Sequence, residues 1–213
     1  MKLLTQSKIK QFFPNHSSNA VEKLLLLINC IIQCRTLCLY KCRDKVGTIN
    51  STKAKVKPES NYMLLIRFFK IKLLEEFLEG ISHLLLSIAQ IDQNYLIMDR
   101  TNWKIGIKHV NLLTIGGLCN GSFIPLQWLQ LGRPGNSNLE NRKKLIDKLI
   151  GLFQWAGKSF KGLILLADRE FVGNRWLEYL VSKEISFVIR LRQNMYGELA
   201  TVAGKKNFAQ VLM

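Results

Sequence analysis

Three β-rich runs in succession, followed by alternating helical and strand patterns, constrain the fold of this chain more than any other feature. The first run, Y-L-I-M-D, ends at Asp99, the second starts at His109 and the third at Ser122, and Gly-containing turns separate them as a β-meander requires. A helical pattern to about Ala156, the apolar run G-L-I-L-L-A-D, a helix over about 173–183 and the strand pattern I-S-F-V-I-R-L-R follow. These patterns predict an α/β domain with the element order β-β-β-α-β-α-β.

Helical patterns dominate the residues up to about 90. One pattern runs from about 20 to 42, and a second from about 61 to 90 is opened by Pro58 and Ser60. The second pattern places four apolar residues on one face: Ile66, Phe69, Leu73 and Phe77. The basic, polar stretch between the two patterns, residues 43–60, is expected to be a linker or a DNA-contacting loop.

Later in the chain, Ser137 followed three residues on by Glu140 predicts a capping box at the start of the helix that runs to about Ala156.

The charge of the chain indicates a polyanionic partner. Lysine and arginine number 31 against 15 aspartates and glutamates, a net charge of +16, with 14 basic and 6 acidic residues up to position 90 and 17 and 9 after it. Nucleic acid is the first candidate for such a partner, and a merely soluble basic surface is the alternative.

With 48% hydrophobic residues the chain has material for a packed core. We expect no membrane span and no secretory signal, and therefore a cytoplasmic protein.

Four cysteines recur at every fourth position of the first helical pattern: Cys30, Cys34, Cys38 and Cys42. On one intact helix they would form a stripe about 18 Å long, which excludes a single tetrahedral zinc site. We expect them to pack as small apolar side chains. We assign no function to the isolated residues His16, His83 and His109.

Two of the predicted strands end on an aspartate, Asp99 and Asp168. Ligands of open α/β sheets bind outside the carboxyl ends of the strands. If the two strands are neighbours, the two carboxylates face each other and need a cation or a shared proton between them. Mg²⁺ or Mn²⁺ fits such hard oxygen ligands and suits phosphodiester chemistry. The alternative is that each aspartate caps a turn or the following helix.

Three motifs carry a family resemblance. They are D-R-T-N-W at Asp99 to Trp103, G-N-S-N at Gly135 to Asn138 and L-A-D-R-E-F at Leu166 to Phe171. Together they resemble the DDE transposases of the bacterial insertion sequence 4 family, over about residues 91–195.

The resemblance implies a ribonuclease H-like mixed sheet in residues 91–213, the catalytic domain, preceded by a helical, basic, DNA-contacting region in residues 1–90. It implies DNA cleavage and strand transfer by carboxylates that hold Mg²⁺ (or Mn²⁺), with Asp99 as the first acid and Asp168 as the second. It also places Arg100, Thr101 and Trp103 in the first signature, and Arg169 and Glu170 in the second, where they support the site or meet DNA. The guanidinium groups of Arg100 and Arg169 either bind phosphate or form ion pairs with a nearby acid.

The chain departs from the family at the third acid. The family carries a glutamate in a Tyr-Arg-Glu-Lys signature on a later helix, whereas here the residues after Arg192 contain only Glu198 as an acid. We therefore expect a C-terminally truncated transposase whose strand cleavage is strongly reduced.

Other basic residues fit a DNA path. Arg142, Lys143, Lys144 and Lys148 lie on the helix after the third strand, and Arg190 and Arg192 alternate along the last strand. The alternative for both sets is a solvated surface.

Three functions follow from these features. The first is a transposase-like protein, impaired by the missing acid, that acts on double-stranded DNA at insertion-sequence ends as a homodimer or with a full-length transposase. The second is a non-catalytic DNA-binding fragment that inhibits or regulates a full-length transposase. The third is a metal-dependent nuclease that completes its site with Glu170 or Glu198.

Overall fold

The computed structural model describes residues 9–70, 74–90, 95–132 and 134–190, and the chain divides into two compact units, Met1–Leu84 and Leu85–Met213. Each unit has its own hydrophobic core.

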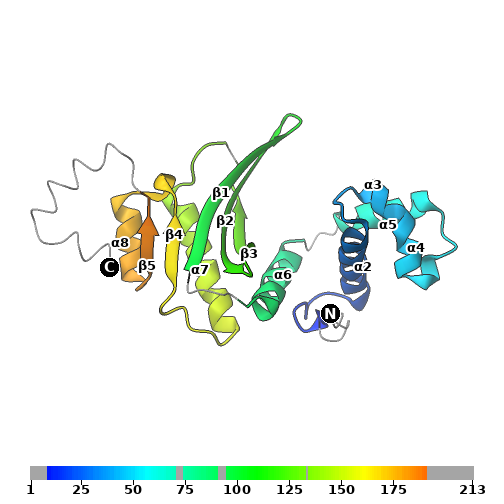
Figure 1. The fold of residues 1–213 in the computed structure, drawn as a ribbon, viewed down its shortest axis with the longest axis horizontal. Coiled ribbons are helices and arrows are strands. Elements are labelled where there is room, and N and C mark those ends of the chain that lie inside the picture. Colours follow the sequence, from blue (N-terminus) through cyan, green and yellow to red (C-terminus); the bar gives the residue numbers. More distant parts are fainter. Residues whose placement is uncertain (1–8, 71–73, 91–94, 133, 191–213) are drawn as a thin grey trace, which may run out of the picture. The chain divides into compact units, whose positions relative to one another are not determined.

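The second unit contains a five-stranded mixed sheet (Figure 1). Its strands are β1 (Tyr95–Ile105), β2 (Lys108–Cys119), β3 (Ser122–Gln130), β4 (Ile164–Ala167) and β5 (Ser186–Ile189). The spatial order is β3-β2-β1-β4-β5, with antiparallel pairs among the first three strands and parallel pairs from β1 to β4 and from β4 to β5. With the intervening helices, this confirms the predicted order β-β-β-α-β-α-β and the ribonuclease H-like fold class.

Helices α7 (Leu139–Trp155) and α8 (Asn174–Ser182) share one core with the sheet. In β1 and β4 the apolar side chains of that core alternate with more exposed ones, so that Leu96 and Leu165, which are register partners, are both buried. Period-two alternation in strands and an apolar stripe on each helix are what such a layered arrangement requires. The sequence pattern therefore indicates the type and order of these elements.

Two turns of the meander depend on particular residues. Asn120 and Gly121, with φ values of 50° and 74°, form the tight connection between β2 and β3, as expected of an Asn-Gly hairpin turn. At the β-bulge between Ile115 and Gly116, β2 approaches β3 so closely that a Cβ on Gly116 would collide with the carbonyl oxygen of Ile124. A larger residue at position 116 would force the two strands apart.

Two local predictions for this unit are wrong in detail. The first strand does not end at Asp99 but continues to Ile105, because its pairing with β2 extends that far. The helix cap is Asn138 rather than Ser137: the Asn138 side chain accepts a hydrogen bond of 2.8 Å from the Asn141 backbone N–H. Ser137 is buried and bonds to Arg142 instead.

The first unit is helical, as predicted, but its helices are shorter than the sequence patterns. Helix α2 (Ser18–Cys34) ends at Arg35, which adopts the left-handed conformation with φ 49°, and α3 (Leu39–Cys42) follows. The predicted linker contains the short helices η1 (Arg43–Lys45), α4 (Val46–Ile49) and η2 (Ser51–Lys53). The predicted helix over 61–90 is two helices, α5 (Pro58–Phe68) and α6 (Leu74–Ile88).

The apolar face predicted for this last segment is consequently only partly present. Phe77 is fully buried, but Phe69 is 51% exposed because α5 ends just before it, and Leu73 lies outside the described residues. The apolar residues do recur at helical spacing, but the pattern continues across the break between α5 and α6. Local periodicity does not reveal such a break.

The break after α2 also changes the interpretation of the cysteines. They do not form one stripe on an intact helix, because the chain turns between Cys34 and Cys38. Cys30 and Cys42 are fully buried in the core of the first unit, which agrees with the expected packing role, whereas Cys38 is exposed. All five cysteines are free thiols.

No single helix in the described part of the chain combines the length and the apolar character of a membrane span. Helix α2 passes such a test only when it is joined to the segment Leu39–Ile49, which meets it at 94°.

Candidate functional site

The two predicted catalytic aspartates lie at one point of the sheet. Strands β1 and β4 pair in parallel, and their last register partners are Met98 and Ala167. The next residues are Asp99, within β1, and Asp168, directly after the end of β4. Since paired strands lie about 4.8 Å apart, the two residues begin from neighbouring backbone positions.

Alternation places both carboxylates on one face. Met98 is buried in the core, and Asp99, one residue later, is exposed. Asp168 keeps an extended backbone, with φ −82° and ψ 170°, and is also exposed. Because register partners share a face and successive residues alternate, Asp99 and Asp168 both point away from the core that Met98 enters.

Arg100, the residue after Asp99, and Glu170, two residues after Asp168, take part in a polar network behind this point. Nε of Arg100 donates to both carboxylate oxygens of Glu170, at 2.9 and 3.0 Å. The two side chains are only 14% and 19% exposed. Of the two alternatives for Arg100, phosphate contact or an ion pair, the structure shows the ion pair.

The third motif, G-N-S-N, joins the same network. Arg100 also donates from Nη1 to the Asn111 side-chain oxygen and from Nη2 to that of Asn136, each at 3.3 Å. Nδ2 of Asn111 donates to the Gly135 carbonyl oxygen at 2.9 Å. The three sequence motifs therefore meet through hydrogen bonds, although up to 70 residues separate them along the chain.

Arg142 completes the network from helix α7. Its guanidinium donates to the Ser137 hydroxyl (2.9 Å), the Ser137 carbonyl oxygen (3.0 Å) and the Glu170 carbonyl oxygen (2.9 Å). It lies over the Phe171 ring, 5.2 Å from its centroid. Burial lowers the pKa of Arg142, and the Glu170 carboxylate opposes that shift. Arg142 is thus a buried structural residue, and its predicted place in a DNA path or on a solvated helix face is wrong.

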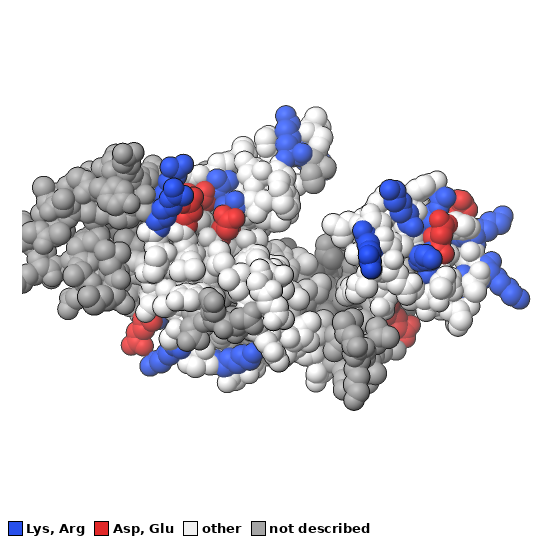
Figure 2. All heavy atoms as spheres, viewed as in Figure 1, with Lys and Arg blue, Asp and Glu red and all other residues white. Residues whose placement is uncertain are grey.

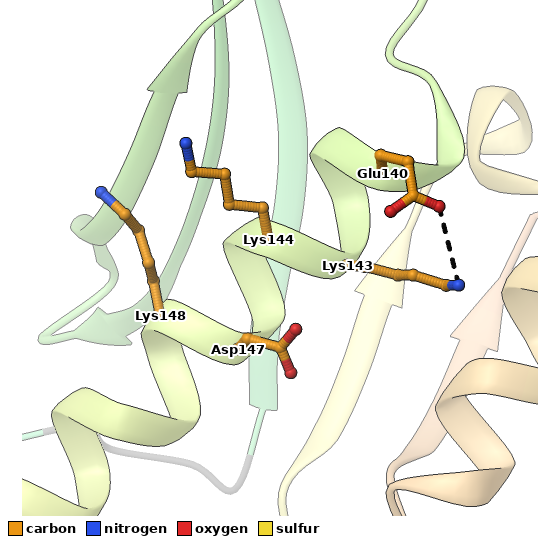
Figure 3. Close-up of a pocket in the computed structure, with 5 residues that line it drawn as sticks. All are labelled: Glu140, Lys143, Lys144, Asp147 and Lys148. Atoms are coloured by element: carbon orange, nitrogen blue, oxygen red, sulfur yellow. Dashed lines mark ion pairs between the residues drawn. The ribbon is translucent and has the colours of Figure 1, made fainter.

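The other basic residues of α7 divide into two groups (Figure 3). Lys143 lies 3.7 Å from Glu140, and Asp147 pairs with Lys183 at 3.3 Å. Lys144 and Lys148 are exposed, point away from those acids and have no ion pair among the described residues. Contact with DNA and a solvated face both stay open for these two lysines.

The remaining predicted DNA-contacting residues are dispersed. Trp103 is 56% exposed and lies further along β1. Arg169 is exposed in the 3₁₀ turn η3 (Arg169–Phe171), directly after Asp168. Arg190 is exposed just beyond the end of β5. Arg192 and Glu198 lie outside the described residues.

Comparisons with known proteins assign no family. No protein-family model and no curated protein matches the chain. Among solved structures, the catalytic core domain of HTLV-2 integrase, in complex with magnesium and in its dimeric form, is similar over 58% of this chain and 82% of that chain. The identity is 11% and the TM-score 0.32, so the fold class rests here on the strand order itself.

Among the described residues, the carboxylates of the site form a pair. Within residues 9–70, 74–90, 95–132 and 134–190, no group of three or more His, Cys, Asp or Glu side chains is arranged to hold a metal ion. Glu170, which was one candidate for completing the site, is held by Arg100. Two carboxylates can still hold Mg²⁺, since this ion keeps several waters and is commonly bound by one or two carboxylates together with substrate phosphates.

Sequence reasoning missed the buried polar residues of the network, above all Asn111 and Asn136. Asn111 is fully buried in β2. A signal for it exists, because an amide side chain within the apolar run H-V-N-L-L requires a partner if it is buried. Asn136 carried no signal of its own beyond its place in the G-N-S-N motif.

Proposed function

We propose that the chain is a transposase-like protein of the insertion sequence 4 type, which cleaves and transfers DNA strands in a metal-dependent reaction in the cytoplasm. The observation that supports this most directly is the position of Asp99 and Asp168. Each follows the last parallel pair of β1 and β4, so both carboxylates lie at one edge and on one face of the sheet. In this proposal residues 1–90 contact DNA, and residues 91–213 carry out the reaction.

The two aspartates would hold the metal ion. Mg²⁺ or Mn²⁺, when bound, supplies activation of an attacking hydroxyl or water and stabilises the leaving oxygen of a phosphodiester. The carboxylates have no other assigned role among the contacts of the described residues. Arg169, beside Asp168, and Trp103, on the strand that carries Asp99, are the side chains we propose for contact with the DNA.

The Arg100–Glu170 pair positions the two aspartates. Arg100 follows Asp99 in β1, and Glu170 lies two residues after Asp168. Their ion pair therefore ties the segment after β4 to β1 at the point where the carboxylates meet. The same pairing engages Glu170, so that among the described residues the two aspartates are left to hold the metal ion.

The activity is tested by nicking of supercoiled plasmid in the presence of Mn²⁺. We expect slow nicking that is abolished by a chelator and reduced more than about tenfold in Asp99→Asn and Asp168→Asn. Glu178→Gln removes an exposed carboxylate from α8 and serves as the matched control, with wild-type activity expected. Equal nicking by the wild type and both aspartate variants would overturn the metal-site proposal.

The alternative function is a DNA-binding protein without catalysis that regulates a full-length transposase. It is favoured by the finding that the described part of the site contains two carboxylates and that Glu170 is engaged elsewhere. In this case DNA binding is sensitive to salt but indifferent to chelator, and it survives Asp99→Asn with Asp168→Asn. Absence of nicking together with such binding would select this function.

A further inference from the structure

The hairpin of β1 and β2 continues beyond the rest of the sheet. Strand β1 pairs with β4 over Tyr95–Met98, and the pairing of β2 with β3 starts at Leu112. In the described part of the chain, residues 102–111 are paired in the sheet only with one another. We call them the hairpin arm, and Figure 1 shows them projecting from the sheet. Four to five residues per strand give a length of about 15 Å.

The root of the arm is held in place. Asn111, the last residue of the arm, is fully buried and bonds to the Gly135 carbonyl oxygen and to Arg100. The backbone oxygen of Asn111 also accepts a hydrogen bond of 2.7 Å from the Leu131 N–H. The arm therefore extends from the same network that supports Asp99 and Asp168.

The tip of the arm carries an apolar side chain at a turn position that does not require one. Gly106, with φ 61°, occupies the first central position of a two-residue turn, where glycine is needed. Asn, Asp or Ser usually follows glycine in such turns. Here Ile107 follows, and it is 91% exposed, more than any other large apolar side chain among the described residues.

Positive charge surrounds this tip. Lys104 and Lys108 are both exposed. Lys104 pairs in register with His109, and Lys108 with Ile105, so alternation directs the two lysines to opposite faces of the arm. The sequence contains no acidic residue between Asp99 and Glu140. Figure 2 shows basic side chains, and no acidic ones, at the tip on the face that is drawn.

From this geometry we propose that the arm enters the major groove of duplex DNA, with Lys104 and Lys108 on phosphates of the two strands and Ile107 against the base edges. The proposal rests on the proposed function, that the chain acts on DNA. The major groove is about 12 Å wide and 8.5 Å deep and admits a two-stranded ribbon, so an arm of about 15 Å reaches its floor. Thymine methyl groups are the apolar features that Ile107 would meet there.

The first test measures binding of the full chain to a labelled duplex at several salt concentrations. We expect Lys104→Gln with Lys108→Gln to weaken binding about tenfold near physiological salt and to reduce the slope of log K against log salt by about two. Lys161→Gln with Lys183→Gln removes the same charge next to the starts of β4 and β5. Because β1, β4 and β5 are parallel, these lysines lie at the end of the sheet opposite to the arm. This control is expected to bind like the wild type.

The second test concerns Ile107. An alternating A·T duplex is compared with one in which deoxyuridine replaces thymidine, which deletes the methyl groups and leaves the charge unchanged. We expect the wild type to bind the uracil duplex several-fold more weakly, and Ile107→Asn to bind both duplexes equally. Circular dichroism confirms that each variant keeps its fold.

The outcomes separate this proposal from the one on which it rests. A wild type that binds no duplex contradicts the proposed function and the arm together. A wild type that binds, with arm variants that bind equally well and with the same salt slope, contradicts the arm alone. Variants that lower the self-association of the chain, measured by sedimentation, while DNA binding is unchanged, would identify the arm as a contact between copies and overturn the proposal.

Discussion

At the scale of single residues, the Arg100–Glu170 pair best shows how the site is stabilised. The guanidinium and the carboxylate are mostly buried and hydrogen-bonded to each other, so removal of one leaves the other without its partner of opposite charge. Hydrogen bonds to charged groups contribute about 1.5–3 kcal/mol, more than neutral ones. The pair therefore contributes to the stability of the second unit as well as to the position of the aspartates.

We expect Glu170→Gln to lower the free energy of unfolding by about 1–3 kcal/mol, measured by urea denaturation followed through tryptophan fluorescence. In a double-mutant cycle, Arg100→Gln with Glu170→Gln costs less than the two single changes added together, because the residues contact each other. Glu178→Gln, at an exposed position, stays within about 0.5 kcal/mol of the wild type. Strict additivity in the cycle would show that the ion pair contributes nothing.

At the scale of secondary-structure elements, the start of α7 separates two polar residues with different tasks. Asn138 caps the helix, and Ser137 holds the buried Arg142. A capping box has the form Ser or Thr, two residues, then Glu or Gln, and Ser137 with Glu140 satisfies this form. The structure places the cap one residue later, because the Ser137 side chain is used in tertiary contacts that a local motif does not include.

Replacement of the cap is expected to destabilise the second unit. Asn138→Ala should cost about 1 kcal/mol, within the range of about 0.5–2 kcal/mol typical of N-cap residues. Glu140→Ala removes the acid of the predicted capping box. Among the described residues, its one ion pair is the 3.7 Å contact with Lys143, so the change in stability should be less than about 0.5 kcal/mol. Thermal unfolding measures both changes. A larger loss for Glu140→Ala than for Asn138→Ala would restore the capping box.

At the scale of the whole molecule, the chain consists of two units with separate cores, and the buried thiols belong to the first. Burial raises the pKa of Cys30 from 9.0 to about 11, with a smaller contribution from the nearby Cys42. Burial also raises the pKa of Cys42 to about 11, with a hydrogen bond to Cys34 as the next cause. Both thiols are thus neutral in the folded protein at physiological pH and pack as apolar groups.

The stability of the first unit should therefore fall as the pH rises from about 9 to 11. In this range the thiols of the unfolded chain lose their protons while the folded ones keep them, so the unfolded state binds fewer protons and alkali favours it. For Cys30 the rise in pKa corresponds to about 2–3 kcal/mol. All four tryptophans lie in the second unit, at positions 103, 128, 155 and 176.

This distribution of tryptophans makes the measurement specific. Helical circular dichroism should begin to decline from about pH 9 while tryptophan fluorescence holds to about pH 10. Above that pH the second unit loses stability as well, because burial and the hydrogen bond to Asp147 raise the pKa of Tyr179. Cys30→Ala should make the stability of the first unit depend less steeply on pH, even if it lowers stability at neutral pH through the loss of packing. Cys38→Ala, at an exposed position, is the control and should leave the pH dependence unchanged. Parallel loss of both signals in the wild type would contradict the assignment to the first unit.

The amino-acid sequence by itself determined the order of strands and helices in the second unit, because alternation and helical periodicity are local properties of the chain. It also located Asp99 in a strand and Asp168 directly after one, and it contained the three motifs that the structure brings together. Only the tertiary structure decided that β1 and β4 are parallel neighbours, that Glu170 binds Arg100, and that Arg142 is buried. These features depend on contacts between residues far apart in the sequence, whose energies no local pattern contains. The breaks at Arg35 and after Phe68 were hidden for the same reason: an apolar period continues across a turn when both sides of it face one core.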